Sequence, residues 1–463
     1  MSPNTAQYNA LGEQPVGKLL LQYAIPAIIA MAASSVYNII DGIFVGQGVG
    51  PDAIMGLALC APLMSLTAAF GAMIGVGGST LMSVRLGQKD YRTAQDILGN
   101  VLAMNIIMGV VLGIVLLLFL YPILRFFGAS DYTIGPAHEF MTVILLANPV
   151  THLYFGLNNM LRSTNRPRHA MYATFGTVGL NCVLAPLFIF VFGWGIRGAA
   201  AATMLSQALM LCWQLKLFSN QDDLVHLRRE IPRLRRDIIG RALMIGLPQF
   251  LINLCACLVA IIITRSLTFF GAQTSVGGDV AVGSYGIQNR LVLFIVMIVL
   301  GLNQGMQPIA GYNFGAQKFD RLLDVLRKAL IFATIITTTG WLICEIFATP
   351  LVTLFAKDSP GLIAEAARGL RINMLTFPLV GIQIIATAFF QSIGYVGKSI
   401  FLSLSRQLLL LLPLLLLLPH VFSNPLDGVW WSLPISDATA FFIAVGMLTW
   451  QVRSLKKKIT NDK

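Results

Sequence analysis

The stretch Val16–Val45 reads VGKLLLQYAIPAIIAMAASSVYNIIDGIFV and is the first of many long apolar runs in the chain. After Lys18 its only charged residue is Asp41. At helical spacing Asp41 shares one face with Asn38, and Tyr37 lies beside them. A carboxylate near the centre of a membrane-spanning helix costs about 2.5 to 3.5 kcal/mol, so an acid kept there indicates a function. The alternative is that Asp41 lies at the outer membrane interface or pairs with a basic residue.

The whole chain has the composition of a membrane protein. Of its 463 residues 56% are apolar and only 11% are charged, and the mean hydropathy is +0.76. Soluble proteins carry roughly a quarter charged residues. Apolar runs of about 20 residues, the length that crosses a bilayer as a helix, recur from end to end. We therefore predict an all-α polytopic membrane protein.

Twelve membrane spans can be placed: 16–45, 52–85, 95–120, 138–162, 170–192, 197–218, 238–270, 279–313, 322–347, 366–395, 398–419 and 430–453. Most of the 32 Lys and Arg residues fall in loops on one side of these spans. Cytoplasmic loops carry such an excess, so both termini are expected in the cytoplasm. The net charge of +12 is therefore a topology signal and does not indicate nucleic-acid binding.

The two halves of the chain resemble each other. IPAIIAM from Ile25 matches LPQFLIN from Leu247, LGQKDY from Leu86 matches FGAQKF from Phe314, and NPVTHLYFG from Asn148 matches FPLVGIQII from Phe377. Landmarks that keep register through six spans predict two pseudo-symmetric six-helix lobes around a central cleft, related by an axis along the membrane normal.

The most polar stretch lies midway and divides the chain. The predicted parts are a cytoplasmic N-terminal tail (1–15), the first lobe with spans 1–6 (16–218), a cytoplasmic linker (219–237), the second lobe with spans 7–12 (238–453) and a basic cytoplasmic tail (454–463).

Polar side chains inside the spans predict the transport pathway. Substrate-cleft candidates in the first lobe are Tyr37, Asn38, Asn158 and Gln207. Those in the second lobe are Gln249, Asn253, Gln288 and Gln383. For any single residue the alternative is an interhelical hydrogen bond worth about 0.6 kcal/mol. Apart from Asp279, spans 7, 8, 10 and 11 are expected to hold no acid. Asp437 in span 12 is expected to pair with Arg290 or Arg406.

The chain lacks the motifs of ATP hydrolysis and of hydrolytic catalysis. GxxxxGK[ST], HExxH and GxSxG are absent, and no Cys/His spacing typical of a metal site occurs. We expect no enzyme activity, no cofactor and no bound metal, and an ion gradient as the driving force. Pro26 lies about four helical turns before Asp41 and is expected to be a hinge, because proline removes a backbone hydrogen bond.

Several motifs resemble the multidrug and toxic compound extrusion (MATE) family, most closely its MepA-like bacterial branch. They are YNIIDGIFVG from Tyr37, GAAAATMLSQ from Gly198, GLNQGMQPIAGYNFGA from Gly301, SRQLLLLLP from Ser405 and PISD from Pro434. The resemblance covers both halves in order. It implies a protein of the bacterial cell membrane that exports small organic compounds, commonly cations, in exchange for protons or sodium ions, with membrane lipid and no nucleic acid as partner.

The resemblance also implies a cation-coupling group. Asp41 matches the family's coupling acid in span 1, Asn181 its span 5 asparagine and Thr203 its span 6 threonine. Ala185 stands where related sequences often carry an Asp four residues after the asparagine, and the second-lobe acids of some relatives are missing. We therefore expect a proton-coupled antiporter centred on Asp41. The alternatives are sodium coupling and a lipid-linked saccharide flippase, which needs basic residues such as Arg290 and Arg406 in the cleft.

Overall fold

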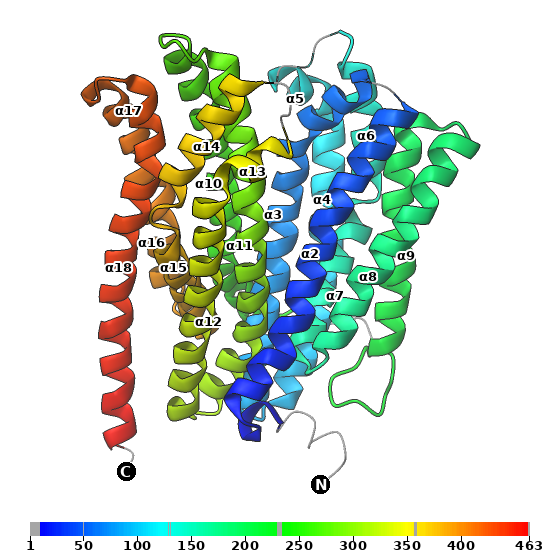
Figure 1. Cartoon of the computed structure of the whole chain (residues 1–463). Coiled ribbons are helices and arrows are strands. Elements are labelled where there is room, and N and C mark those ends of the chain that lie inside the picture. Colours follow the sequence, from blue (N-terminus) through cyan, green and yellow to red (C-terminus); the bar gives the residue numbers. More distant parts are fainter. Residues whose placement is uncertain are drawn as a thin grey trace. The chain divides into compact units, whose positions relative to one another are not determined.

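A computed structural model describes residues 10–49, 51–127, 129, 131–228, 234–355 and 359–461. Within these ranges every regular element is a helix (Figure 1). The first half contains α2 (Val16–Gly48), α3 (Pro51–Gly87), α4 (Tyr91–Leu118), α5 (Leu120–Phe126), α6 (Ile134–Leu146), α7 (Asn148–Ser163), α8 (Pro167–Pro186), the π-helical segment η1 (Leu187–Val191) and α9 (Gly195–Phe218).

The second half repeats this order. It contains α10 (Arg236–Gly271), α11 (Gly278–Gly315), α12 (Phe319–Ile346), α13 (Ala348–Thr353), α14 (Pro360–Met374), α15 (Phe377–Ser392), α16 (Val396–Leu404), the π-helical segment η2 (Ser405–Leu411), α17 (Leu412–Val421) and α18 (Pro425–Asn461).

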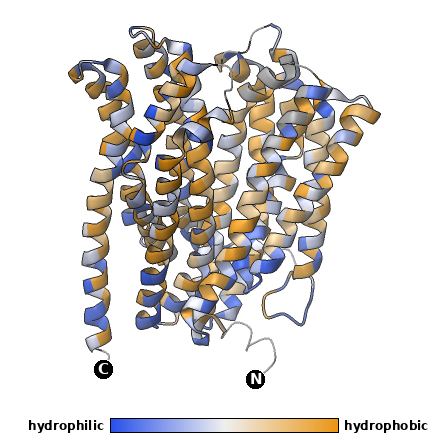
Figure 2. Ribbon diagram, viewed as in Figure 1, coloured by the Kyte–Doolittle hydropathy of each residue, from blue (hydrophilic) through white to orange (hydrophobic). Residues whose placement is uncertain are grey.

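The helices match the twelve predicted spans. In the described ranges nine of them are long and apolar enough to cross a membrane, and two bent pairs, α6 with α7 and α14 with α15, would bring the number to eleven. The twelfth span is α9, whose Ala, Thr, Ser and Gln residues make it less apolar. Apolar residues predominate along the middle of the long helices, as Figure 2 shows for α10 and α11. The all-α polytopic fold class predicted from the sequence is confirmed.

The sequence repeat is visible in the backbone. The bent pairs turn by 56° and 52°, and α7 and α15 both carry proline in their first turn, Pro149 and Pro378. Proline is favoured there because its missing N–H is unpaired in any first helical turn. The turns after α3 and α11 have left-handed residues at matching positions, Lys89 with φ 59° and Gln317 with φ 58°. Spans 5 and 11 each contain a π-helical segment.

Contacts divide the chain into two compact units. Unit 1 comprises Met1–Phe250 with Gly311–Lys318, and unit 2 comprises Leu251–Ala310 with Phe319–Lys463. The first residues of α10 and the last of α11 thus pack with unit 1. The lobes predicted at 16–218 and 238–453 stay a prediction.

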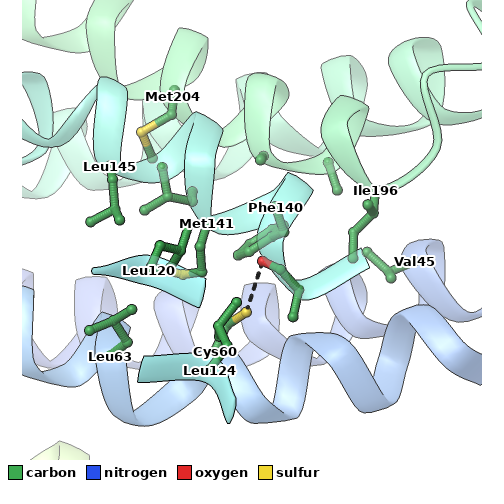
Figure 3. Close-up of a cluster of buried hydrophobic side chains, with 14 of the residues drawn as sticks. Val45, Cys60, Leu63, Leu120, Leu124, Phe140, Met141, Leu145, Ile196 and Met204 are labelled. Atoms are coloured by element: carbon green, nitrogen blue, oxygen red, sulfur yellow. Dashed lines mark hydrogen bonds between the residues drawn. The ribbon is translucent and has the colours of Figure 1, made fainter. Parts of the chain in front are cut away.

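The apolar core of unit 1 is built from short and long helices together. Figure 3 shows residues of α2, α3, α5, α6 and α9 that pack there: Val45, Cys60, Leu63, Leu120, Leu124, Phe140, Met141, Leu145, Ile196 and Met204. The Cys60 thiol donates a hydrogen bond to the carbonyl oxygen of Ala137, with 3.5 Å between sulfur and oxygen. Cys60 therefore packs as a small apolar residue.

Unit 1 also contains two very close helix crossings, both on α3. A methyl group on Gly77 would lie 1.9 Å from the carbonyl oxygen of Ala242 on α10, and one on Gly246 would lie 1.8 Å from that of Met73. Glycine alone permits such an approach of two backbones. We call this pair of contacts the α3–α10 crossing.

The α3–α11 crossing has the same design. A methyl group on Gly87 would lie 2.0 Å from the carbonyl oxygen of Tyr312, and one on Gly315 would lie 2.0 Å from that of Val84. Gly87 and Gly315 occupy matching positions in the two sequence repeats, so repeat-related residues meet each other within unit 1.

The beginning of the central linker is held against unit 1. Arg166 forms an ion pair with Asp223, and Gln95 hydrogen-bonds both the amide and the carbonyl group of His226. Residues 229–233 lie outside the described ranges. The linker therefore has at least two anchors between Ser219 and His226.

Candidate functional site

Three of the predicted polar residues meet inside unit 1. The Tyr37 hydroxyl of α2 lies 3.1 Å from Thr203 Oγ1 of α9, and Asn181 Nδ2 of α8 donates to the same Oγ1 over 2.9 Å. Thr203 Oγ1 also lies 3.1 Å from the carbonyl oxygen of Ala199, one turn earlier on α9. Thr203 thus joins the three helices α2, α8 and α9 at one point.

The hydrogen-bond directions follow from the inventory of the hydroxyl group. A threonine hydroxyl has one proton and two lone pairs. Since the proton of Thr203 is donated to the Ala199 carbonyl, both Asn181 and Tyr37 donate to Thr203. The carbonyl oxygen of the Asn181 side chain and the lone pairs of the Tyr37 hydroxyl keep accepting capacity for a proton donor or a cation.

Asp41 lies on α2 one turn after Tyr37. Its side chain is partly buried, and Oδ1 is buried with no hydrogen-bond partner among the described residues. A buried carboxylate oxygen without a partner forfeits about 1 to 3 kcal/mol or more. A proton on Asp41, or a cation beside it, would remove this penalty.

Ala185, one turn after Asn181, packs among apolar side chains. It is fully buried in the apolar core of unit 1, in the same cluster as Val45 and Ile189. The alanine follows Asn181 by one turn of α8, directly before the π-helical segment η1. A carboxylate at this position would be placed among apolar side chains.

The remaining cleft candidates of unit 1 have mixed surroundings. Asn158 is buried and donates to the carbonyl oxygen of Ala170 over 3.0 Å, a bond that joins α7 to α8. Gln207 accepts a hydrogen bond of 2.8 Å from Thr151. Gln249 is half-buried near the end of the unit, and the side chain of Asn38 lies outside the described residues. Asn158 and Gln207 thus serve at least as helix contacts.

The other three candidates belong to unit 2. Asn253 is half-buried on α10, whereas Gln288 on α11 and Gln383 on α15 are buried. The expectation that all eight candidates line one cleft stays a prediction. Pro26 lies inside α2, which continues through it from Val16 to Gly48.

One acid was missed by the sequence reasoning. The tenth span begins at Pro360, before the predicted residue 366, and its first half α14 contains Glu365. The expectation that span 10 holds no acid was therefore wrong. Ser359 followed by Pro360 is a usual helix start and would have extended the span. Three charged residues in α14 interrupted the apolar run and concealed it.

The other deep acid of unit 2 is paired as expected. Asp437 of α18 accepts a hydrogen bond of 2.7 Å from Arg406 Nε in η2, and the Ser436 hydroxyl donates to the Arg406 carbonyl oxygen over 2.8 Å. Of the two arginines proposed as its partner, Arg406 is the one that the structure places there.

Comparison with known proteins now assigns the chain to a family. The MatE family matches residues 26–187 and 250–417, which lie in the first and the second sequence repeat respectively. The chain belongs to the MatE family. The matched residues lie in both halves of the chain, and the resemblance found in the sequence is confirmed.

Individual relatives span nearly the whole chain. The multidrug export protein MepA of Staphylococcus haemolyticus is 26% identical over 451 residues, which cover 97% of this chain and 96% of that protein. An outward-facing structure of a multidrug resistance MATE family transporter of the MOP superfamily has a TM-score of 0.90 and 25% identity, with 99% of each chain covered.

A third comparison concerns the polarity of the pocket. A MOP superfamily transporter from Pyrococcus furiosus has a TM-score of 0.90 and 25% identity over 98% of this chain and 99% of its own. The reverse polarity of its binding pocket suggests a different function for that protein.

Proposed function

We propose that the protein is a secondary antiporter that exports amphiphilic, cationic organic compounds in exchange for protons, with coupling at Asp41. Membership in the MatE family and the likeness to MepA, a multidrug export protein, support export of several drugs. The observation that carries the proposal is the buried Oδ1 of Asp41, which has no partner among the described residues.

Protonation of Asp41 would act on helix packing through its neighbours. The neutral acid no longer attracts a cationic substrate, and its new O–H becomes a hydrogen-bond donor. Tyr37, one turn away, donates to Thr203 and thereby connects α2 to α8 and α9. A proton on Asp41 therefore releases substrate and changes the balance of hydrogen bonds among three helices, while Pro26 lets α2 bend.

Thermodynamic linkage sets the condition for coupling. Substrate and proton shift the transporter between its states only by as much as each binds one state better than the other. Competition for the carboxylate of Asp41 supplies such a difference, because a cation prefers the ionised form. Neither ATP nor a cofactor enters this cycle, and we assign no enzyme activity to the chain.

The alanine at position 185, where related sequences often carry an aspartate, favours proton coupling over sodium coupling. Sodium ions are held by several oxygen ligands, usually with carboxylates among them. In unit 1 the position of the second carboxylate is Ala185, which packs in the apolar core. The flippase alternative is weakened because Arg406 is engaged by Asp437, which leaves Arg290 as the basic residue for an anionic headgroup.

The proposed setting is the bacterial cell membrane, with both termini in the cytoplasm. The many apolar helices support a multi-pass protein, and exposed apolar side chains such as Ile114 (55%) and Leu118 (74%) on α4 fit a surface covered by lipid. The proposed orientation of the protein in the membrane rests on the excess of Lys and Arg in the predicted inner loops.

The test is transport by Asp41→Asn in everted membrane vesicles. Uptake of a fluorescent cation such as ethidium into these vesicles, the direction that corresponds to export from the cell, is driven by a pH gradient with the acidic side inside and compared at equal amounts of protein. We expect Asp41→Asn to abolish pH-driven transport and Asp41→Glu to retain part of it. Asp324→Asn, at an exposed ion pair with Lys328, is the control and is expected to transport normally. Wild-type transport by Asp41→Asn would reject the coupling role.

A further inference from the structure

Lys398 of α16 is held among aromatic rings in unit 2. Its Nζ atom lies 4.0 Å from the ring centroid of Trp450 on α18. It also lies 4.9 Å from the ring centroid of Tyr395 and 5.4 Å from that of Phe390 on α15. The ammonium group donates a hydrogen bond to Oε1 of Gln451. Lys398 therefore has a fixed position beside Trp450, and none of these four partners neutralises its charge.

The residues around Lys398 differ in their exposure. Phe390 and Gln451 are 0% and 2% exposed, whereas Trp450 is 63% exposed. Trp450 is the last exposed large apolar residue of α18, about two turns after Phe442, which is 70% exposed. Tryptophan is enriched where the hydrocarbon of a bilayer meets the headgroups. Trp450 thus marks the depth at which α18 leaves the hydrocarbon.

Basic residues follow Trp450 on the same face of α18. Arg453 and Lys457 are exposed and come three and seven residues after it, a spacing that places side chains on one face of a helix. Figure 2 shows hydrophilic residues gathered in these last turns of α18. At about 1.5 Å per residue, Arg453 and Lys457 lie about 4.5 and 10.5 Å beyond Trp450. The headgroup layer of one leaflet is roughly 5 to 7 Å thick, so both long side chains reach it.

The positive charges beside Trp450 are not balanced by acids. After Asp437 the described part of the chain contains no acidic residue. No ion pair among the described residues includes Lys398, Arg453 or Lys457. Three cations and an exposed indole ring are therefore available to a partner outside the protein.

We propose that the surface formed by Trp450, Lys398, Arg453 and Lys457 binds the headgroup of an anionic phospholipid. The three cations attract the phosphate diester, and the indole packs against the glycerol backbone and the first methylene groups of the acyl chains. A zwitterionic lipid carries a cation of its own, which the three positive groups repel. Because its neighbours already restrict Lys398, little of its side-chain entropy is lost when the lipid binds.

This lipid site is independent of the coupling role of Asp41. Lys398 and α18 belong to unit 2, whereas Asp41 belongs to unit 1. Lipid binding is measured without an ion gradient and without a transported compound. Loss of transport in Asp41→Asn and loss of lipid selectivity in Arg453→Gln are therefore separate results.

The experiment measures quenching of Trp450 fluorescence by lipids with brominated acyl chains. The purified full-length protein is reconstituted in mixtures of phosphatidylglycerol and phosphatidylcholine, in which one or the other lipid is brominated. Subtracting the signal of Trp450→Phe isolates Trp450 from the other tryptophans. Each lysine or arginine near an anionic headgroup strengthens binding about fivefold. We expect the wild-type protein to prefer phosphatidylglycerol to phosphatidylcholine beside Trp450 by roughly tenfold or more.

Single substitutions test the cations of the surface. Arg453→Gln and Lys457→Gln replace exposed side chains, so the protein should fold normally, and each should lower the selectivity for phosphatidylglycerol by about fivefold. Lys398→Gln should lower it at least as much. The matched control is Lys458→Gln, which removes the same charge from the same helix. Lys458 Nζ lies 5.9 Å from the ring centroid of Phe319 on α12, so this variant should keep wild-type selectivity.

Three results would overturn the proposal. One is equal quenching of Trp450 by the two brominated lipids in the wild-type protein. Another is an equal loss of selectivity in Lys458→Gln and Arg453→Gln, because overall charge would then explain the preference. The third is displacement of the lipid by excess inorganic phosphate, which would identify a site for free anions. We expect phosphate to leave the quenching unchanged, since a free anion makes no apolar contact with the indole.

Discussion

The α3–α10 crossing predicts a large loss of stability from the smallest possible substitution. In Gly246→Ala the new methyl carbon would lie 1.8 Å from the carbonyl oxygen, 2.6 Å from the carbonyl carbon and 3.0 Å from the Cα atom of Met73. All three are backbone atoms, so no rotamer change relieves the clash. A tolerable carbon–oxygen contact is about 3.3 Å, so the two helices must separate by about 1.5 Å.

The magnitude follows from this separation. Overpacking usually costs about 1 to 3 kcal/mol, and a clash with a helix backbone lies at the upper end. A loss of about 3 kcal/mol in the free energy of unfolding would lower the midpoint of thermal unfolding by about 6 °C or more for a unit of this size. The measurement is the midpoint of thermal unfolding of the purified protein in one detergent.

The same helix offers the matched control. A methyl group on Gly240 would meet nothing within 4 Å. Gly240→Ala is therefore expected to be neutral, or to stabilise the protein by up to about 1 kcal/mol because alanine favours the helix. If Gly246→Ala unfolds at the same temperature as Gly240→Ala, the close approach of α3 and α10 is refuted.

Three further predictions concern single interactions. Thr203→Val removes the shared acceptor of Asn181 and Tyr37, and should cost about 1 to 3 kcal/mol in thermal stability and lower export. The control Thr142→Val, which loses an exposed hydrogen bond within its own helix, should cost less. Arg406→Met leaves Asp437 buried and unpaired, so it should lower the free energy of unfolding by about 3 kcal/mol in a denaturation assay. Adding Asp437→Leu should restore most of the lost stability. Asp90 caps α4, and hydrogen bonds from Thr93 lower the pKa of its carboxyl group. The ionised carboxylate should contribute about 1 kcal/mol to the stability of the protein above the ordinary aspartate pKa, and this contribution should disappear as the pH falls through the lowered pKa. The variant Asp90→Asn should not show this pH dependence.

Much of the fold was predictable because a bilayer imposes simple rules. Spans must be long and apolar, so helices such as α10 and α11 could be located to within a few residues. The repeat was detectable because its landmarks, Pro149 with Pro378 and Gly87 with Gly315, perform the same backbone task in both halves. Backbone constraints of this kind require proline or glycine, and these residue types can be recognised in the sequence.

The sites were less predictable because they depend on contacts between distant helices. Asp41 stood out as a lone charge, but the hydrogen bonds that join Tyr37, one turn before it, to Asn181 through Thr203 require the packing of α2 on α8 and α9. Glu365 was missed because charges at the start of α14 made the apolar run begin too late. The indole N–H of Trp430, which donates a hydrogen bond of 2.8 Å to Glu365, lies four helices later in the chain, and no local pattern connects the two residues.

Ion dependence of transport tests the central claim most directly. Proteoliposomes containing the purified protein would be given either a proton gradient with equal sodium on both sides, or a sodium gradient at equal pH. The account predicts that the proton gradient alone drives transport of a fluorescent cation and that Asp41→Asn abolishes it. Transport driven by the sodium gradient alone, with none under the proton gradient, would contradict it.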